Sequence, residues 1–228
     1  MILADNLAIY ANPGFTSPDA LTLFSAWQTS LSYSFQLYFD FSGYADMAIG
    51  VALLFNIKLP INFNSPFQST NIIDFWSKWH ITLTKFITSY IYIPIVRSFS
   101  SFSFHKAMLA TFASIFIAGV WHGAGWTFVT YGALHGVALI VNHYWRKTKI
   151  QLNKYVAWLL FFMFINIAFI IFRSNTLEDA FSIIFALINF TNIGSVNLAA
   201  FALITASLLI TTLLKNTSSY LNDNIKTS

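Results

Sequence analysis

The feature that most constrains this chain is a series of apolar stretches, each long enough to cross a lipid bilayer as a helix. The clearest of them cover residues 104–121, 126–145, 155–173 and 196–214. A spanning α-helix needs about 20 predominantly apolar residues. Charged residues make up 9% of the 228 residues, against about a quarter in soluble domains. The sequence therefore predicts an all-α integral membrane protein, a multi-helix transmembrane bundle that forms one domain over residues 1–228.

A further apolar segment, residues 21–57, is interrupted by "DFSGYAD" at residues 40–46. Acidic residues and glycine weaken a helix interior, so this segment is predicted to form either a tight hairpin of two short helices or one broken helix. Near the other end of the chain, Thr176 and Asp179 have the spacing of a capping box. A helix is therefore predicted to begin directly after Thr176.

The basic residues predict how the chain is oriented in the membrane. The loop at residues 146–154 carries four of them and no acid: Arg146, Lys147, Lys149 and Lys154. Because basic residues collect in cytoplasmic loops, this loop is predicted to be cytoplasmic. Alternation then puts residues 121–126 and 174–179 outside and returns the tail, with Lys215 and Lys226, to the inside. The net charge of +4 thus reflects membrane orientation, and no nucleic-acid partner is expected.

An ionisable residue, His135, lies in the middle of the apolar stretch 126–145, close to the predicted bilayer midplane. At helical spacing one side of this stretch collects polar or small residues: Thr127, Tyr131, His135, Ala138 and Asn142. A neutral histidine bonded to a neighbouring helix is one interpretation. The other interpretation is a functional group. The midplane position of His135 and the polar side of the stretch favour this interpretation, since ionisable residues inside membranes mark functional sites. The small neighbours Gly132, Gly136 and Ala138 predict a cavity beside the ring.

A second histidine lies in "NIIDFWSKWHITLTKFITSYIYIP", residues 71–94, which is too rich in charges to span a membrane. Asn71 is a good N-cap, and Pro94 is expected to stop the helix. At 100° per residue the charged and hydroxyl side chains share one face, and His80 falls nearly opposite them. The segment is therefore predicted to be one amphipathic helix, interfacial or re-entrant, from which His80 points into the protein.

Three blocks, in this order, resemble the membrane-bound O-acyltransferase family and its alginate O-acetylase-like branch: "YFDFSGYADMAIG" (38–50), "FWSKWHITLT" (75–84) and "WHGAGWTFVTYGALHG" (121–136). The resemblance runs from about residue 1 to residue 190 and covers what is normally the C-terminal half of such a protein. It implies that His135 is the catalytic histidine and His80 a second important one. Ser77 and Lys78 stand where the family usually has one or two arginines.

The resemblance also implies a reaction. An acyl group, most simply acetyl, would pass from a cytoplasmic thioester, acyl-CoA or a charged acyl carrier protein, to a hydroxyl of an extracytoplasmic polysaccharide or wall polymer. No tightly bound cofactor is expected. The implied location is the bacterial cytoplasmic (inner) membrane, crossed several times. The implied partners are membrane lipid, the acceptor polymer, and an extracytoplasmic acyltransferase or an N-terminal half, so the isolated chain is expected to be inactive and to expose the stripe around His135 to lipid.

The chemistry fits an imidazole, which can accept the proton of a hydroxyl near neutral pH and contribute about two to four powers of ten in rate. We therefore predict that His135 is the general base, with Tyr131 or Asn142 either orienting its ring or donating to the developing oxyanion. His80 and His135 lack a third ligand, so no metal site is predicted. The remaining histidines, His122, His105 and His143, are assigned to helix ends, and His122 is given a possible part in acceptor access. A transporter, which would usually show internal repeats, and a non-catalytic remnant are the alternatives.

Overall fold

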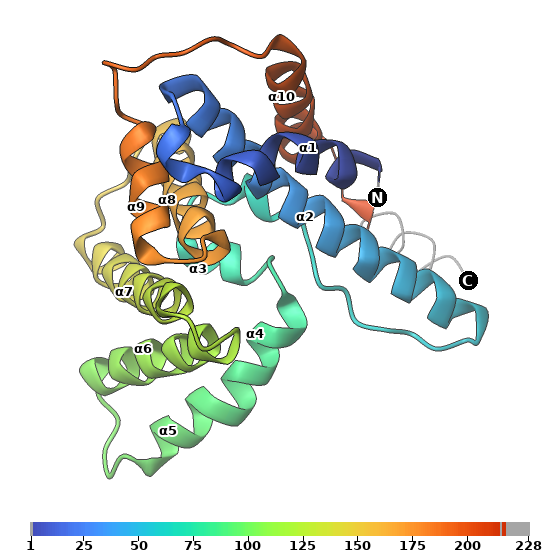
Figure 1. The fold of residues 1–228 in the computed structure, drawn as a ribbon. Helices are drawn as coiled ribbons and strands as arrows, with labels where there is room; N and C mark the ends of the chain where they lie inside the picture. Colours follow the sequence, from blue (N-terminus) through green and yellow to red (C-terminus); the bar gives the residue numbers. More distant parts are fainter. Residues whose placement is uncertain (1, 215, 218–228) are drawn as a thin grey trace.

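The computed structural model describes residues 2–214 and 216–217, and every regular element within these residues is helical (Figure 1). The first half of the chain contains α1 (Ile2–Thr16), α2 (Leu23–Leu54), α3 (Ile72–Trp76), α4 (Ile81–Ile87) and α5 (Ile93–Ser98). The second half contains α6 (Phe104–Trp121), α7 (Trp126–Thr148), α8 (Lys154–Arg173), α9 (Leu177–Ala186) and α10 (Leu198–Leu213). The all-α fold predicted from the sequence is confirmed.

The four predicted apolar stretches form helices α6, α7, α8 and α10. Among the described residues, α2, α6 and α8 are long and apolar enough to cross a membrane. Helix α10 is apolar but has only 16 residues. Helix α7 has 23 residues, which is about 34 Å at 1.5 Å per residue, and its polar stripe makes it less hydrophobic than its neighbours. Length and composition together therefore support a membrane protein.

Helix α2 runs without interruption over 32 residues, so the predicted hairpin or break within residues 21–57 was wrong. Asp40 is exposed and Asp46 is half-buried, which leaves both carboxylates at the surface of the helix. Gly43 has no neighbouring atom within 4 Å of the position of a Cβ, so no close packing forces a bend there. A single glycine costs a helix only about 1 kcal/mol, and α2 also packs against α1 (Figure 1).

The segment 71–94 begins as predicted but is not one helix. The Asp74 amide donates to Asn71 Oδ1 at 2.9 Å, so Asn71 is the N-cap of α3. The chain then breaks at His80, whose backbone is left-handed with φ of 45°. Pro94 does not stop a helix either, because a π-helical stretch, Thr88–Tyr92, joins α4 to α5 without a gap and the helical backbone continues through Pro94 to Ser98. The prediction of a single amphipathic helix was therefore wrong.

A distant loop residue, Asn62, explains the break at His80. The Ile81 amide donates to the Asn62 carbonyl oxygen at 3.0 Å. The amide and the hydroxyl of Thr82 both donate to Asn62 Oδ1, at 3.2 Å and 2.6 Å. These bonds satisfy donors of the first turn of α4 that a continuous helix would have paired internally. The loop therefore makes a new helix start at residue 81 favourable.

Helices α6 and α7 form an antiparallel pair whose backbones touch. A Cβ added to Gly119 would lie 2.5 Å from the Gly132 Cα, and one added to Gly136 would lie 2.7 Å from the Phe112 ring. Small residues allow this kind of close approach between membrane helices. Gly132 and Gly136 therefore serve helix packing, and the prediction that they border a cavity was wrong.

Contacts between helix ends bring together segments that the predicted orientation places on the same side of the membrane. The Trp158 indole at the start of α8 donates to the Phe67 carbonyl oxygen at 2.8 Å, and the end of α10 reaches the same loop through Gln68 and Leu214. On the opposite side, the Leu23 amide at the start of α2 donates to the carbonyl oxygen of Asn192, which follows α9, at 2.8 Å. Which of these sides is cytoplasmic stays a prediction. Two residues of the predicted inner tail lie outside the described residues: Lys215 and Lys226.

Candidate functional site

His135 is fully buried, with an exposed fraction of 0%, and its partner is a tryptophan from α3. The Trp76 indole Nε1–H donates to His135 Nδ1 at 3.2 Å, and the two rings meet edge to face with centroids 5.4 Å apart. The short helix α3, which Asn71 caps, packs against α7 and delivers the indole to this place. The two residues are 59 positions apart in the sequence, so the contact depends on tertiary structure alone.

Two more aromatic rings enclose His135. Tyr131 lies one helical turn earlier on α7 with its ring centroid 4.3 Å away, and Phe164 of α8 lies 5.4 Å away. Thr127 and Tyr131 are buried as well. The central part of the polar stripe is thus covered by residues of this same chain. The expectation that the chain alone would expose this stripe to lipid was wrong.

The hydrogen bond from Trp76 fixes where the proton of a neutral His135 ring lies. An indole N–H only donates, so the ring nitrogen that faces it must present a lone pair. In a neutral imidazole the hydrogen is then on the other nitrogen, Nε2, which is buried and has no hydrogen-bond partner among the described residues. Trp76, rather than Tyr131 or Asn142, is the residue that orients the ring by a hydrogen bond.

His80 points into the protein, as predicted, from the break between α3 and α4. Its ring packs edge to face on Phe41 of α2 at 4.8 Å, and its Nδ1 is buried without a hydrogen-bond partner in the described part of the chain. It lines a cavity of about 60 Å³, room for about two water molecules. The wall of this cavity also contains Trp76, Tyr131 and His122.

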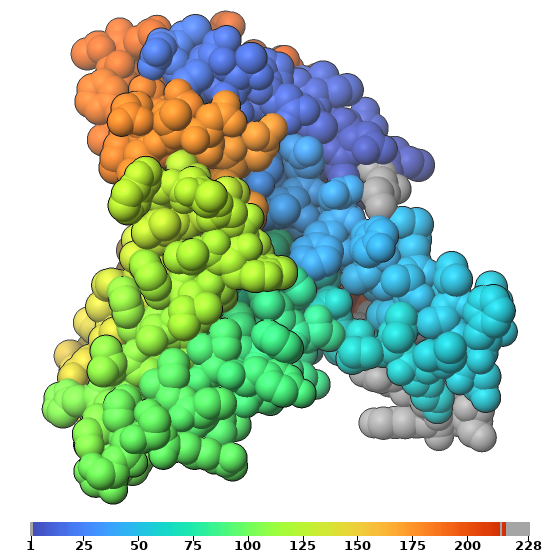
Figure 2. Space-filling model, turned by 60° about the horizontal axis from the view of Figure 1, so that its bottom comes forward, coloured from blue at the N-terminus to red at the C-terminus, as the bar shows by residue number. Residues whose placement is uncertain are grey.

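The cavity brings His80 and His122 together, whereas His135 lies behind its wall. His135 does not line the cavity, but both Trp76 and Tyr131, which contact its ring, do. Helices α2 and α4 contribute to the wall and then diverge (Figure 1), and Figure 2 shows a notch between α4–α5, in green, and the C-terminal end of α2, in cyan. A larger depression of about 550 Å³ lies along α1, but Asp5 is the one titratable residue in its wall, so it offers no acid–base pair.

Burial disfavours the charged form of both cavity histidines. Burial, and secondarily the neighbouring His122, lower the pKa of His80 to about 4. Burial also lowers the pKa of His122, whose ring packs on Phe172 at 5.2 Å. His122 was assigned to a helix end from the sequence, and the structure adds that it shares a cavity wall with His80.

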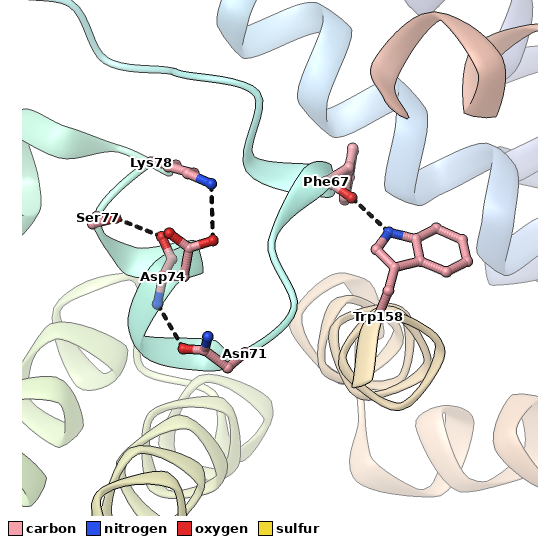
Figure 3. A network of polar contacts seen from close by, with 6 residues as sticks. All are labelled: Phe67, Asn71, Asp74, Ser77, Lys78 and Trp158. Atoms are coloured by element: carbon pink, nitrogen blue, oxygen red, sulfur yellow. Dashed lines mark hydrogen bonds and ion pairs between the residues drawn. The ribbon is translucent and has the colours of Figure 1, made fainter. Parts of the chain in front are cut away.

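The polar residues of α3 form a separate network away from the cavity (Figure 3). Lys78 Nζ pairs with Asp74 Oδ2 at 2.8 Å, and the Ser77 hydroxyl donates to the Asp74 carbonyl oxygen at 2.6 Å. These contacts close the turn that follows α3, so Ser77 and Lys78 have a local structural role here. No group of three His, Cys, Asp or Glu residues within the described ranges is placed to hold a metal ion.

Comparison with known proteins gives a family. The model described as "MBOAT, membrane-bound O-acyltransferase family" matches residues 3–178. The chain is 47% identical over 204 residues to a peptidoglycan O-acetyltransferase of Helicobacter pylori, and the matched region covers 87% of this chain and 38% of that protein. It is 35% identical over 192 residues to a probable alginate O-acetylase of Azotobacter vinelandii, covering 83% of this chain and 38% of that protein. A teichoic acid D-alanyltransferase of Streptococcus thermophilus is 34% identical over 127 residues, 54% of this chain and 31% of that protein.

Proposed function

The chain belongs to the membrane-bound O-acyltransferase family, and from this premise we propose that it carries the acyl-transfer site of an enzyme that modifies a polysaccharide or wall polymer. The acyl group, most simply acetyl, comes from a thioester on the cytoplasmic side, acyl-CoA or a charged acyl carrier protein. It goes to a polymer hydroxyl on the outer side of the bacterial cytoplasmic membrane. The names of the relatives, two O-acetylating proteins and a D-alanyltransferase, support this class of reaction.

The observation that carries the proposal is the arrangement of imidazoles around one small cavity. His80 and His122 line it, and His135 contacts two of its wall residues, Trp76 and Tyr131. In the reaction the hydroxyl oxygen forms a bond to the acyl carbon, the carbon–sulfur bond breaks, and the thiolate leaves with the electron pair. The hydroxyl proton must pass to a base, and a neutral imidazole is suited to receive it. We assign His135 and His80 to this chemistry.

The composition of the chain excludes an acyl-cysteine intermediate on this chain. The chain contains no cysteine, so it supplies no thiol that could carry the acyl group between them. The chain spans about 38% of the length of the first two relatives. We therefore include a protein partner in the proposal, either a polypeptide equivalent to the remainder of those relatives or an extracytoplasmic acyltransferase that accepts the group.

The proposal is tested by measuring ester-linked acyl groups, released from envelope polymers by mild base, in cells with and without the gene. Loss of the gene removes these esters, and restoring it returns them. His135→Ala and His80→Ala fail to restore them, whereas His143→Ala, on the same helix α7 but outside the cavity wall, does restore them. Normal esters in the cells that lack the gene would show the proposed function to be wrong.

Each variant is also quantified in the membrane, because His135 is more than a reactive group. Its ring fills space between three aromatic side chains and accepts the Trp76 hydrogen bond. Removing the ring leaves a buried donor unpaired, at a cost of about 1–3 kcal/mol. Esters are therefore normalised to the amount of folded protein, so that lost transfer is not confused with lost protein.

A further inference from the structure

We propose that Trp76 is a positioning residue that holds His135 in the tautomer with the hydrogen on Nε2, so that His135 acts as a hydrogen-bond donor to the acyl carbonyl oxygen and not as the base. This inference rests on the proposed function and deepens it. It replaces the general-base role predicted for His135 from the sequence. It also assigns a role to a tryptophan that the sequence analysis did not single out.

The first step concerns the nitrogen that faces the indole. The Trp76 Nε1–H to His135 Nδ1 distance is 3.2 Å, and both residues are buried, with exposed fractions of 6% and 0%. Water therefore does not compete for this bond. An indole cannot accept a hydrogen bond in return, so the facing nitrogen keeps its lone pair. Turning the imidazole by 180° would exchange the two nitrogens but would leave the same requirement.

The second step concerns which nitrogen of the His135 ring carries the hydrogen and which carries a lone pair. A base needs a free lone pair, but the lone pair on Nδ1 is engaged by Trp76, and Nε2 carries the hydrogen. Protonating Nδ1 would place its N–H directly opposite the N–H of the Trp76 indole, in a buried site where neither donor has another partner. The bond from Trp76 thus disfavours the imidazolium form, as a hydrogen bond to the neutral form of a group does in general. His135 is a poor proton acceptor in this arrangement.

The third step concerns what the Nε2–H can do. It is buried without a partner among the described residues, and a buried donor is costly to leave unpaired. An acyl carbonyl oxygen would satisfy it, which requires the acyl group to reach past Trp76 and Tyr131, the wall residues that separate His135 from the cavity. A neutral imidazole N–H is an established way of polarising a carbonyl in enzymes, and a donor fixed in place before the reaction stabilises the negative charge that develops on that oxygen.

The fourth step assigns the proton. His80 lines the cavity, and its Nδ1 is buried and unpartnered in the described part of the chain. As the hydroxyl oxygen bonds to the acyl carbon, the hydroxyl proton passes to His80, and His135 Nε2–H holds the carbonyl oxygen. The carbon–sulfur bond then breaks, the thiolate leaves with the electron pair, and His80 returns the proton to it.

The first test is spectroscopic and needs no catalysis. Histidine labelled with ¹⁵N and ¹³C is incorporated into the full chain, and the His135 signal is identified by its loss in His135→Gln. The expected result is a neutral ring with the hydrogen on Nε2, and a loss of that preference in Trp76→Phe. A hydrogen on Nδ1, a charged ring, or an unchanged tautomer in Trp76→Phe would overturn the inference.

The second test is kinetic and uses the polymer ester measurement. Trp76→Phe keeps an aromatic ring but removes the N–H, and we expect transfer to fall about 10- to 100-fold, the size of the effect when a hydrogen-bond partner that orients a metal-binding histidine is removed. Trp158→Phe is the matched control, because its indole donates to the Phe67 carbonyl oxygen at 2.8 Å outside the cavity wall (Figure 3). An equal loss in both variants would identify a merely structural effect and overturn the inference.

Glutamine at position 135 separates donor from base. Its amide can donate a hydrogen bond but cannot accept a proton at neutral pH, so His135→Gln should transfer at least about 10-fold faster than His135→Ala. Equal rates in the two variants would overturn the donor role. If the unmodified chain in its cell supports no transfer at all, the proposed function fails, and the spectroscopic test still decides the tautomer.

Discussion

The contact between Gly119 and Gly132 offers a sharp test of how α6 holds α7 in place. In Gly119→Ala the new Cβ would lie 2.5 Å from the Gly132 Cα, 2.7 Å from the Gly132 amide nitrogen and 2.8 Å from the Phe128 carbonyl oxygen. All three atoms belong to the backbone, so no side-chain rotation relieves the clash. Ordinary contacts between carbon atoms are about 3.5–4.0 Å, and α6 and α7 must therefore separate by about 1 Å.

The size of the effect follows from a comparison with Gly43→Ala. Both substitutions replace glycine within a helix and gain about 1 kcal/mol of helix propensity, but a Cβ at Gly43 meets nothing within 4 Å. The difference between the two variants therefore isolates the overpacking cost, about 1–3 kcal/mol. In a chain of this size that corresponds to about 2–4 °C in the unfolding midpoint for each kcal/mol. Gly43→Ala should raise the midpoint, and Gly119→Ala should lie several degrees below it.

The assay is thermal unfolding of the two purified variants in one detergent, followed by intrinsic tryptophan fluorescence, together with the polymer ester measurement in cells. Gly132 lies three residues before His135 on α7, so separating the helices also moves the imidazole relative to α3. A displacement of about 1 Å can cost about 100-fold in rate, and we expect a loss of that order in Gly119→Ala. Equal midpoints in the two variants would refute the direct backbone contact between α6 and α7.

Three further outcomes are expected. A cysteine at Lys149 should resist an impermeant thiol reagent added to intact cells, whereas one at exposed Ala124 should react; the chain has no cysteine of its own, and the reverse pattern would invert the orientation. Thr176→Ala should lower the free energy of unfolding by about 1 kcal/mol, measured in detergent, and Thr176→Ser should restore it. His80, facing His122, is neutral in the folded state with a pKa of about 4, whereas its unfolded pKa is near 6.5, so stability falls as pH drops from 6.5 to 4. His80→Gln should flatten that decline in a pH series of unfolding midpoints, and an unchanged slope would contradict the burial of the ring.

Features set by nearby residues could be predicted from the sequence. The apolar stretches gave the helices, because a membrane helix satisfies its backbone within one segment. The caps at Asn71 and Thr176 are confirmed by their hydrogen bonds to Asp74 and Asp179, because a cap involves residues three positions apart. His80 was also correctly predicted to point inward, although the helix on which that inference relied is broken.

Features set by distant residues could not be predicted. The break at His80 depends on Asn62, about 20 positions earlier, and no local preference of residues 71–94 reveals it. The bond from Trp76 to His135 crosses 59 positions, so a helical periodicity computed within α7 could find the imidazole but not its partner. The glycines beside His135 carried an ambiguous signal, because small residues suit both a cavity and a close helix contact. Phe112 and Gly119 of α6 decide between the two.

The burial of the stripe on α7 changes what a missing partner would mean for this chain. The three rings around His135 come from α3, α7 and α8, all within the chain itself. The environment of the imidazole, including its hydrogen bond, is therefore built without any other polypeptide. By contrast, the cavity beside it holds about 60 Å³, far less than the 300–1,000 Å³ typical of ligand pockets. The partner proposed above would therefore act by shaping the space for donor and acceptor, and not by sheltering the histidine.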